Sequence, residues 1–261
     1  MSFINTSWWI IPLLITSFSG VLCPAMGSVL ITHKRLLQVN LISHCVLPGL
    51  ALAMALGIDP SIGGVLSGLV GAIAAESLTN KKNQNYEAVM NTILAGSMGL
   101  GVLLIPLLGI RIDLEAVLFG DLLTANLSDL LRTLIAFSAF ICLMLFGYDK
   151  LVHIGLDPEG AASSGVNVSF LNLALGFTTA LVIVSSMSAV GVILVITLLS
   201  TPTLVGLQKA RSLWIAMLRS SIFGLVLSLI GFSLAMIMNL PPGPLISVLC
   251  VISLILLPKN N

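Results

Sequence analysis

The stretch SHCVLPGLALAMALGI, residues 43–58, carries His44 at the start of a run that contains no acidic, lysine or arginine side chain. The apolar run begins at Leu41, so its length approaches the roughly 20 residues that cross a bilayer as a helix. An uninterrupted run of this kind has no polar face to present to water. The stretch therefore predicts a membrane helix that carries one ionisable side chain.

The rest of the chain has the same character. Its 261 residues are 57% hydrophobic and 8% charged, whereas soluble domains carry roughly 25% charged residues. The mean hydropathy is +1.14. This composition excludes a water-soluble globule and predicts an integral membrane protein surrounded by lipid bilayer. The net charge of +1 gives no indication of a nucleic acid partner.

Nine apolar segments, identified by their length and interruptions, are candidates to span the membrane. They are residues 8–31, 41–57, 61–78, 89–109, 127–146, 170–187, 189–207, 213–238 and 245–257. The sixth and seventh could instead form one broken, partly re-entrant pair, and the last is short for a span. We therefore expect an all-α, polytopic transmembrane helical bundle of eight or nine spans, forming a single permease domain over residues 1–261.

The basic residues are distributed unevenly between the connections. If the nine segments alternate, nine of the eleven lysines and arginines fall on one side, and only Arg111 and Arg132 fall opposite. The positive-inside rule makes the richer side cytoplasmic. This predicts a multi-pass protein of the cell inner (plasma) membrane with a cytoplasmic C-terminus.

Small residues and cysteines lie mostly within the apolar segments. The glycines of GGVLSGLVG, residues 63–71, recur at a spacing that permits close contact between membrane helices. The cysteines show no CxxC spacing, so we expect them to be buried packing residues; they are Cys23, Cys45, Cys142 and Cys250. No GK[ST] sequence occurs, so the chain has no Walker A site and is not expected to hydrolyse ATP itself.

The first candidate site lies at the beginning of the segment quoted above. On a helix, Asn40 lies one turn before His44 on the same face, because side chains at i and i+4 are neighbours. An amide oxygen and an imidazole nitrogen could contribute to a transient transition-metal site. The alternative is a histidine hydrogen-bonded between helices. Pro48 and Gly49 follow, and such breaks can free backbone carbonyls to line a pathway, although both residues also occur in membrane helices for packing alone.

The second candidate is the polar stretch GLDPEGAASSGVNV, residues 155–168, in the longest predicted cytoplasmic connection. An aspartate followed by proline is typical of a helix start, with the aspartate as cap and the proline in the first turn. Small residues four and eight positions after the aspartate would form one face of a short helix that docks in a groove of another protein. The alternative is an ordinary loop. The residues concerned are Asp157, Pro158, Glu159, Ala161 and Gly165.

The third candidate is LLSTPTLVG, residues 198–206, where Pro202 interrupts an apolar run. The neighbouring hydroxyl groups could satisfy the backbone groups that a proline frees. Pro202 is therefore a candidate helix break along a pathway, with a simple kink as the alternative.

Taken in order, these stretches resemble the permease subunits of manganese, zinc and iron ABC importers, over nearly the whole chain. SHCVLPGLALA resembles the family's SHAVLPGVALA, and AVLFGDLL, residues 116–123, is similar to LFGDLL or LFGNIL. LDPEGAASSGV, residues 156–166, resembles the cytoplasmic DxxxAxxxG segment. SAVGVILVITLLSTPTLVG, residues 188–206, is similar to VGxxLxxxLLxxPAAxA, and LPPGPLISVL, residues 240–249, to AGPSIVL.

The resemblance implies a homodimeric, all-helical permease that moves a divalent metal ion, manganese or zinc rather than iron, by alternating access. It implies a cytoplasmic ABC ATPase dimer and an extracytoplasmic metal-binding protein as partners, with no permanently bound cofactor. Residues 155–168 would be the coupling helix that docks on the ATPase. Two other readings remain: a permease for a metal chelate such as a siderophore or cobalamin, and a passive metal carrier or channel.

The family's metal site uses the aspartate and histidine of GDAISHAVLPG. The histidine corresponds to His44, whereas the aspartate corresponds to Asn40. Asparagine keeps an oxygen ligand but loses a charge, which a dehydrated divalent ion in a low-dielectric cavity would feel strongly.

Overall fold

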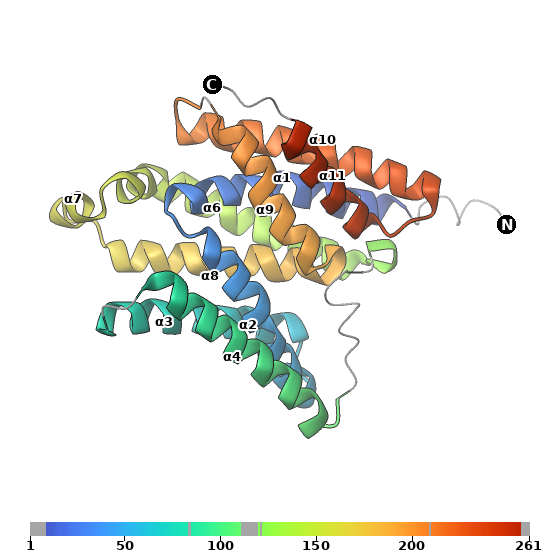
Figure 1. The fold of residues 1–261 in the computed structure, drawn as a ribbon, viewed down its shortest axis with the longest axis horizontal. Helices are drawn as coiled ribbons and strands as arrows, with labels where there is room; N and C mark the ends of the chain where they lie inside the picture. Colours follow the sequence, from blue (N-terminus) through green and yellow to red (C-terminus); the bar gives the residue numbers. More distant parts are fainter. Residues whose placement is uncertain (1–8, 83–84, 111–119, 121, 209, 257–261) are drawn as a thin grey trace. The chain divides into compact units, whose positions relative to one another are not determined.

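The structure is a computed structural model that describes residues 9–82, 85–110, 120, 122–208 and 210–256. Every regular element in these ranges is a helix, which confirms the all-α prediction (Figure 1). The elements in chain order are α1 (Ile10–Thr32), α2 (Leu36–Ala55), α3 (Pro60–Lys82), α4 (Tyr86–Leu107), the 3-10 turn η1 (Leu122–Thr124), α6 (Leu127–Leu156), α7 (Pro158–Ser163), α8 (Val168–Val190), α9 (Val192–Leu207), α10 (Leu213–Met238) and α11 (Pro242–Leu256).

Each of the nine predicted segments coincides with a separate long helix. Six of the helices found in the described ranges, α1, α2, α4, α6, α8 and α10, are long and apolar enough to cross a membrane. The apolar part of α3 (Pro60–Ala75), α9 and α11 are shorter. The predicted count of eight or nine spans therefore stays a prediction, while the sixth and seventh segments are two helices that meet at Gly191, where φ is 86°.

The chain divides into two compact units, which we describe separately. Unit 1 contains residues 1–32, 115–142 and 185–261, and unit 2 contains residues 33–114 and 143–184. The prediction that residues 1–261 act as one permease domain stays a prediction.

In unit 1, α1 packs against α9 and α10, and α11 packs against both α9 and α10 (Figure 1). The α1–α9 contact requires glycine, since a Cβ atom at Gly27 would lie 2.0 Å from the carbonyl oxygen of Leu199. Buried hydroxyl groups join α1 to α10, where the Ser28 Oγ donates to the Ser220 Oγ at 3.0 Å. Close backbone approach and hydroxyl bonds of this kind are typical of packed membrane helices.

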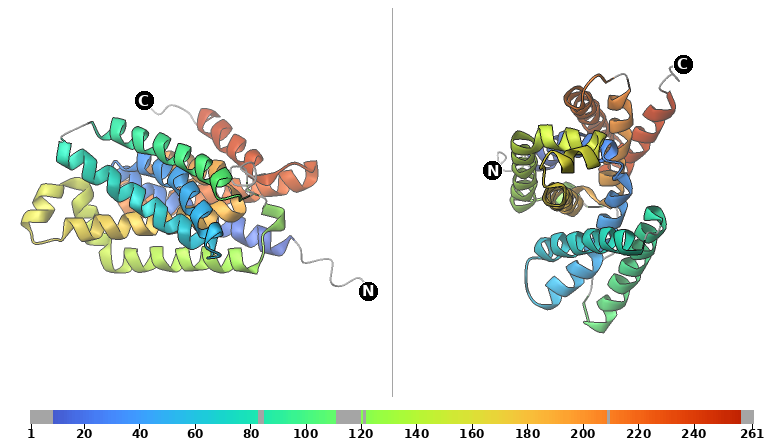
Figure 2. Two further views of the ribbon diagram at one scale, coloured as in Figure 1. Left: turned by 90° about the horizontal axis from the view of Figure 1, so that it is seen from below. Right: turned by 90° about the vertical axis from the view of Figure 1, so that its left-hand side faces the viewer.

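In unit 2, α3 and α4 lie alongside α2 (Figure 2). A Cβ atom at Gly49 would lie 2.1 Å from the carbonyl oxygen of Gly63, and one at Gly71 would lie 2.4 Å from the Cys45 Sγ. The glycine cluster at residues 63–71 thus packs against α2, which confirms its predicted role. Three cysteines are buried as expected, but Cys142 is exposed on α6, so its predicted burial is wrong.

Candidate ion-contact and coupling sites

The candidate ion contacts lie in the first half of α2. Asn40 is exposed and His44 is partly buried, and their spacing places them one turn apart on one face. Val39, which precedes Asn40, and Ser43, which precedes His44, are both buried. The helix therefore directs the amide and the imidazole to its less buried side, and its apolar residues to the interior of unit 2.

The neighbouring Cys45 is a packing residue. Its Sγ donates to the Ser97 Oγ of α4 at 3.1 Å, and its carbonyl oxygen accepts from the Ser67 Oγ of α3 at 2.6 Å. Ser43 is also engaged, since its Oγ donates to the Val39 carbonyl at 2.8 Å. Neither side chain is free to join the Asn40–His44 pair.

The Asn40–His44 pair offers one amide oxygen and one imidazole, and a contact with an ion stays a prediction. In the described part of the chain, no group of three or more histidine, cysteine, aspartate or glutamate side chains could hold a metal. Resident zinc sites use three or four protein ligands, so an amide and one imidazole do not by themselves form such a site.

The expected helix break at Pro48 and Gly49 does not occur, because α2 continues through both residues to Ala55. Proline has no N–H, so the carbonyl oxygen of His44 lacks its helical donor. Gly49 serves the close contact with α3 described above, and a pathway role for either residue stays a prediction.

Pro202 is likewise buried inside a helix that continues, since α9 extends to Leu207. Pro202 leaves the carbonyl oxygen of Leu198 without its helical donor. The hydroxyl groups of Ser200 and Thr203 donate to other carbonyl oxygens. Ser200 donates to Ile196 at 2.8 Å, and Thr203 donates to the Pro24 carbonyl of α1 at 3.0 Å. The segment packs α9 against α1, and its place in a pathway stays a prediction.

The chain interruption in this region lies at Gly191, which sequence reasoning did not single out. A Cβ atom at Gly120 would lie 2.4 Å from the Gly191 backbone nitrogen, and both glycines have positive φ, 70° and 86°. The sequence did contain a signal for this contact, because Gly120 belongs to the LFGDLL motif. The other residues of that motif before Leu122 lie outside the described ranges.

The predicted coupling segment contains α7, and its start is formed as the sequence indicated. Asp157 caps the helix, where its Oδ1 accepts from the Gly160 backbone N–H at 3.0 Å, and Pro158 occupies the first turn. Glu159 is exposed in that turn, where a carboxylate interacts favourably with the helix dipole.

The end of α7 corrects one part of the prediction. Ala161 is 0% exposed, and Gly165 lies beyond the helix with φ of 80°. The Val166 N–H donates to the Ala161 carbonyl and the Gly165 N–H to the Ala162 carbonyl, both at 3.1 Å. This is the Schellman pattern, in which glycine ends the helix. Ala161 and Gly165 therefore do not form one docking face, because the former packs inward and the latter is a cap.

Outside the predicted spans, His33 connects α1 to α2. Partial burial and then the positive charge of Arg35 lower the pKa of His33 from 6.5 to about 4, against an opposing hydrogen bond with the Leu151 backbone. Burial and the neighbouring Arg35 therefore both disfavour the charged form of the imidazole.

Three comparisons with known proteins relate this geometry to function. A family model described as the ABC 3 transport family matches residues 8–258. The manganese import system permease protein ScaB of Streptococcus parasanguinis is 32% identical over 256 residues, covering 95% of this chain and 90% of that protein. The chelated iron transport system membrane protein YfeD of Yersinia pestis is 31% identical over 232 residues, covering 88% and 78%.

Among solved structures, PsaBC from Streptococcus pneumoniae in complex with Fab matches with a TM-score of 0.86 and 28% identity. The match covers 98% of this chain and 94% of that chain. The arrangement of helices is thus shared over almost the entire length.

Proposed function

This chain belongs to the ABC 3 transport family, and from that membership we propose that it is the membrane permease subunit of an ATP-driven importer of a divalent transition-metal ion. The observation that carries the proposal is the match to a manganese import permease over 95% of this chain. With six apolar helices of spanning length in the described ranges, the chain is a multi-pass membrane protein. Manganese or zinc is the proposed cargo, ahead of iron.

The proposed ion contacts are His44 and Asn40. Imidazole suits zinc, manganese and iron, and amide oxygen suits the harder manganese ion. Where the family pattern has a carboxylate, Asn40 supplies no charge, so the electrostatic attraction for the ion is weaker. Weak binding favours release, which a transporter needs as much as capture.

The proposed ATPase contact is the exposed surface of α7, formed by Glu159, Ala162 and Ser163. The helix is capped at both ends, and only four residues separate the end of α7 from the start of α8. Motion of a docked ATPase would therefore pass directly to a long membrane helix. In this scheme ATP closes an ATPase dimer, and α7 transmits the closure to a homodimer of permease subunits that alternates its access.

The proposed orientation follows from the basic residues, nine of which share one side when the nine segments alternate. That side holds α7 and the C-terminus, and it is cytoplasmic. The opposite side receives the ion from an extracytoplasmic metal-binding protein.

His44→Ala tests the ion contact. We expect manganese uptake into cells that contain the cognate ATPase and binding protein to fall roughly tenfold or more, as losses at metal ligands and their partners commonly do. Cys45→Ala is the matched control at the adjacent buried position, with membrane abundance of both variants measured by immunoblot. Undiminished uptake by His44→Ala would remove His44 from the mechanism.

Ala162→Trp tests the coupling surface without altering either cap of α7. We expect the variant to assemble with its ATPase but to hydrolyse ATP without matching uptake. Leu145→Trp, on an exposed position of α6, controls for a bulky side chain elsewhere in the same unit. Normal coupling in Ala162→Trp would reject this assignment.

A metal chelate is the second candidate cargo, because the relative YfeD is named for chelated iron transport. Competition separates the two. Free manganese or zinc should compete with labelled manganese for uptake, whereas a ferric chelate should not. Uptake that persists after ATP depletion would instead indicate a passive carrier.

A further inference from the structure

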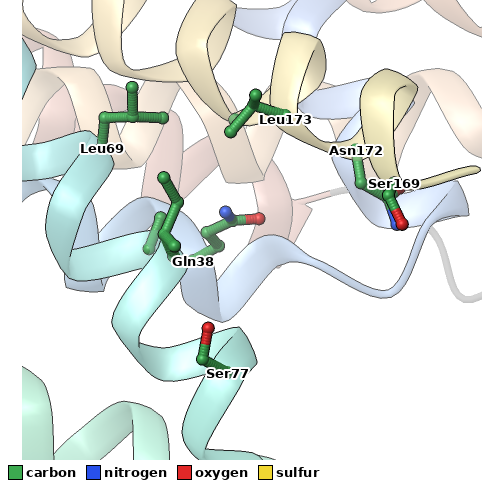
Figure 3. Close-up of a pocket in the computed structure, with 9 residues that line it drawn as sticks. Gln38, Leu69, Ser77, Ser169, Asn172 and Leu173 are labelled. Carbon is green, nitrogen blue, oxygen red and sulfur yellow. The ribbon is translucent and has the colours of Figure 1, made fainter. Parts of the chain in front are cut away.

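Unit 2 contains a cavity of about 240 Å³ at the end where α2 begins, α3 ends and α8 begins. Its polar lining residues are Gln38 of α2, Ser77 of α3, and Ser169 and Asn172 of α8. Figure 3 shows Gln38 between the α3 residues on one side and the α8 residues on the other.

Two of the side chains that line this cavity carry an acceptor oxygen with no partner in the described part of the protein. Gln38 is 3% exposed, and its Oε1 atom is buried without a hydrogen bond. The Oδ1 atom of Asn172 is also buried without one. Buried polar atoms are nearly always bonded, because an unmade bond costs the desolvation of the group. Donors from outside the chain, either a water or a ligand that displaces it, would satisfy both oxygens.

Among ligands larger than water, the lining favours a positively charged donor. An anion would meet two carbonyl oxygens and no lysine, arginine or histidine among the lining residues. A dehydrated divalent ion is equally unsuited, because such ions take carboxylates or several waters as ligands. A primary ammonium has three N–H donors, which match the two amide oxygens and the flanking serine hydroxyls.

The rim of the cavity indicates where this ammonium comes from. One turn inward from Ser77, Ile73 is 43% exposed, and one turn inward from Ser169, Leu173 is 46% exposed. Exposed apolar side chains therefore lie close to the hydroxyl groups on both helices, as expected on a surface that contacts lipid chains near their headgroups. Lys34, exposed two residues before α2, is placed to attract a lipid phosphate.

We propose that this cavity binds the primary ammonium headgroup of an aminophospholipid. The amide oxygens of Gln38 and Asn172 accept its N–H donors, while the acyl chains follow the exposed apolar residues of α3 and α8. The site lies on the α3–α8 side of α2, away from the Asn40–His44 face, and it does not depend on metal import.

N-methylation of the lipid provides the test, since phosphatidylcholine keeps the positive charge of phosphatidylethanolamine but has no N–H donor. Short-chain forms of both lipids are titrated into the delipidated permease–ATPase complex, and adducts are counted by native mass spectrometry. We expect phosphatidylethanolamine to bind at least about tenfold more tightly, because charge-assisted hydrogen bonds are among the strong ones. Equal affinity for the two lipids would overturn the proposal.

Two further arms identify the source and the residues. If free ethanolamine or Mn²⁺ displaces the lipid at comparable concentration, the site recognises a free cation and not a lipid headgroup. Gln38→Met and Asn172→Leu should each reduce phosphatidylethanolamine affinity to that of phosphatidylcholine, whereas Gln208→Met, at an exposed position in unit 1, should not. If one cavity variant fails to fold, the other variant and the wild-type lipid comparison still decide the outcome.

Discussion

The backbone N–H of Val166 donates to the carbonyl oxygen of Ala161 at 3.1 Å, and this bond closes the C-terminal end of α7. Asp157 closes the other end by accepting from the Gly160 N–H. Because both ends are satisfied within the segment itself, this six-residue helix keeps its conformation without support from a partner. In the docking role that we propose for α7, a preformed helix would lose little conformational entropy when an ATPase binds.

Gly165 should tolerate asparagine better than valine. A φ of 80° costs an ordinary L-residue roughly 1–2 kcal/mol, and a β-branched residue most of all, whereas asparagine adopts this region more readily. We expect Gly165→Val to lower the ratio of metal transported to ATP hydrolysed, and Gly165→Asn to retain most of it. Both are measured in proteoliposomes; equal coupling in the two variants would show that the cap is dispensable.

Asn40→Asp should tighten ion binding. A carboxylate restores a charge beside the cation, although exposure and salt screen part of the gain, so we expect the half-saturating manganese concentration to fall on the order of fivefold. Uptake rates across a manganese series measure it. Asn40→Ala is the control and should raise that concentration; if aspartate and alanine behave alike, Asn40 does not contact the ion.

Gly27→Ala should destabilise unit 1. The added Cβ atom would lie 2.0 Å from the Leu199 carbonyl oxygen, and relieving such a clash in a packed core costs roughly 1–3 kcal/mol. Gly99→Ala on α4 is the matched control, because nothing lies within 4 Å of its added methyl group. The midpoint of thermal unfolding in detergent should fall for the first variant alone, and an unchanged midpoint would contradict the close α1–α9 contact.

His33 should make stability depend on pH. Its pKa is about 4 in the folded chain and 6.5 as a free side chain, so the unfolded chain takes up the proton first as the pH falls. The free energy of unfolding is therefore highest above pH 6.5 and declines as the pH falls toward 4. Thermal unfolding between these pH values measures the decline.

His33→Gln removes the titration while keeping a donor for the Leu151 backbone, and it should flatten that decline. His153→Gln, at an exposed histidine, should leave it in place. A His33→Gln variant with the pH dependence of the wild type would assign the effect to another group.

The helices and the start of α7 were predictable because their causes are local. Apolar length sets each membrane helix, and an aspartate before a proline sets a helix start. The two ends of α7 show where local sequence signals predict the structure correctly and where they do not. Small-residue spacing suggested one face for Ala161 and Gly165, but the backbone ends the helix between them.

The residues of the candidate ion site could be predicted from the sequence, but the contacts around them could not. The spacing of Asn40 and His44 places them on one face of any helix, whereas the engagement of Cys45 with Ser97 and Ser67 depends on α3 and α4. Sequence spacing cannot show which neighbouring helix approaches a given face.

The sequence by itself determined that this chain is a helical membrane protein of a metal-transport type, since composition, apolar length and ordered motifs are properties of the chain alone. The tertiary structure decided which polar groups lack partners. Gln38 and Asn172 are separated by more than a hundred residues, yet both side chains, each with an unbonded oxygen, line one cavity. Burial and hydrogen bonding depend on helices that meet only after folding, and for that reason no sequence motif indicated the cavity.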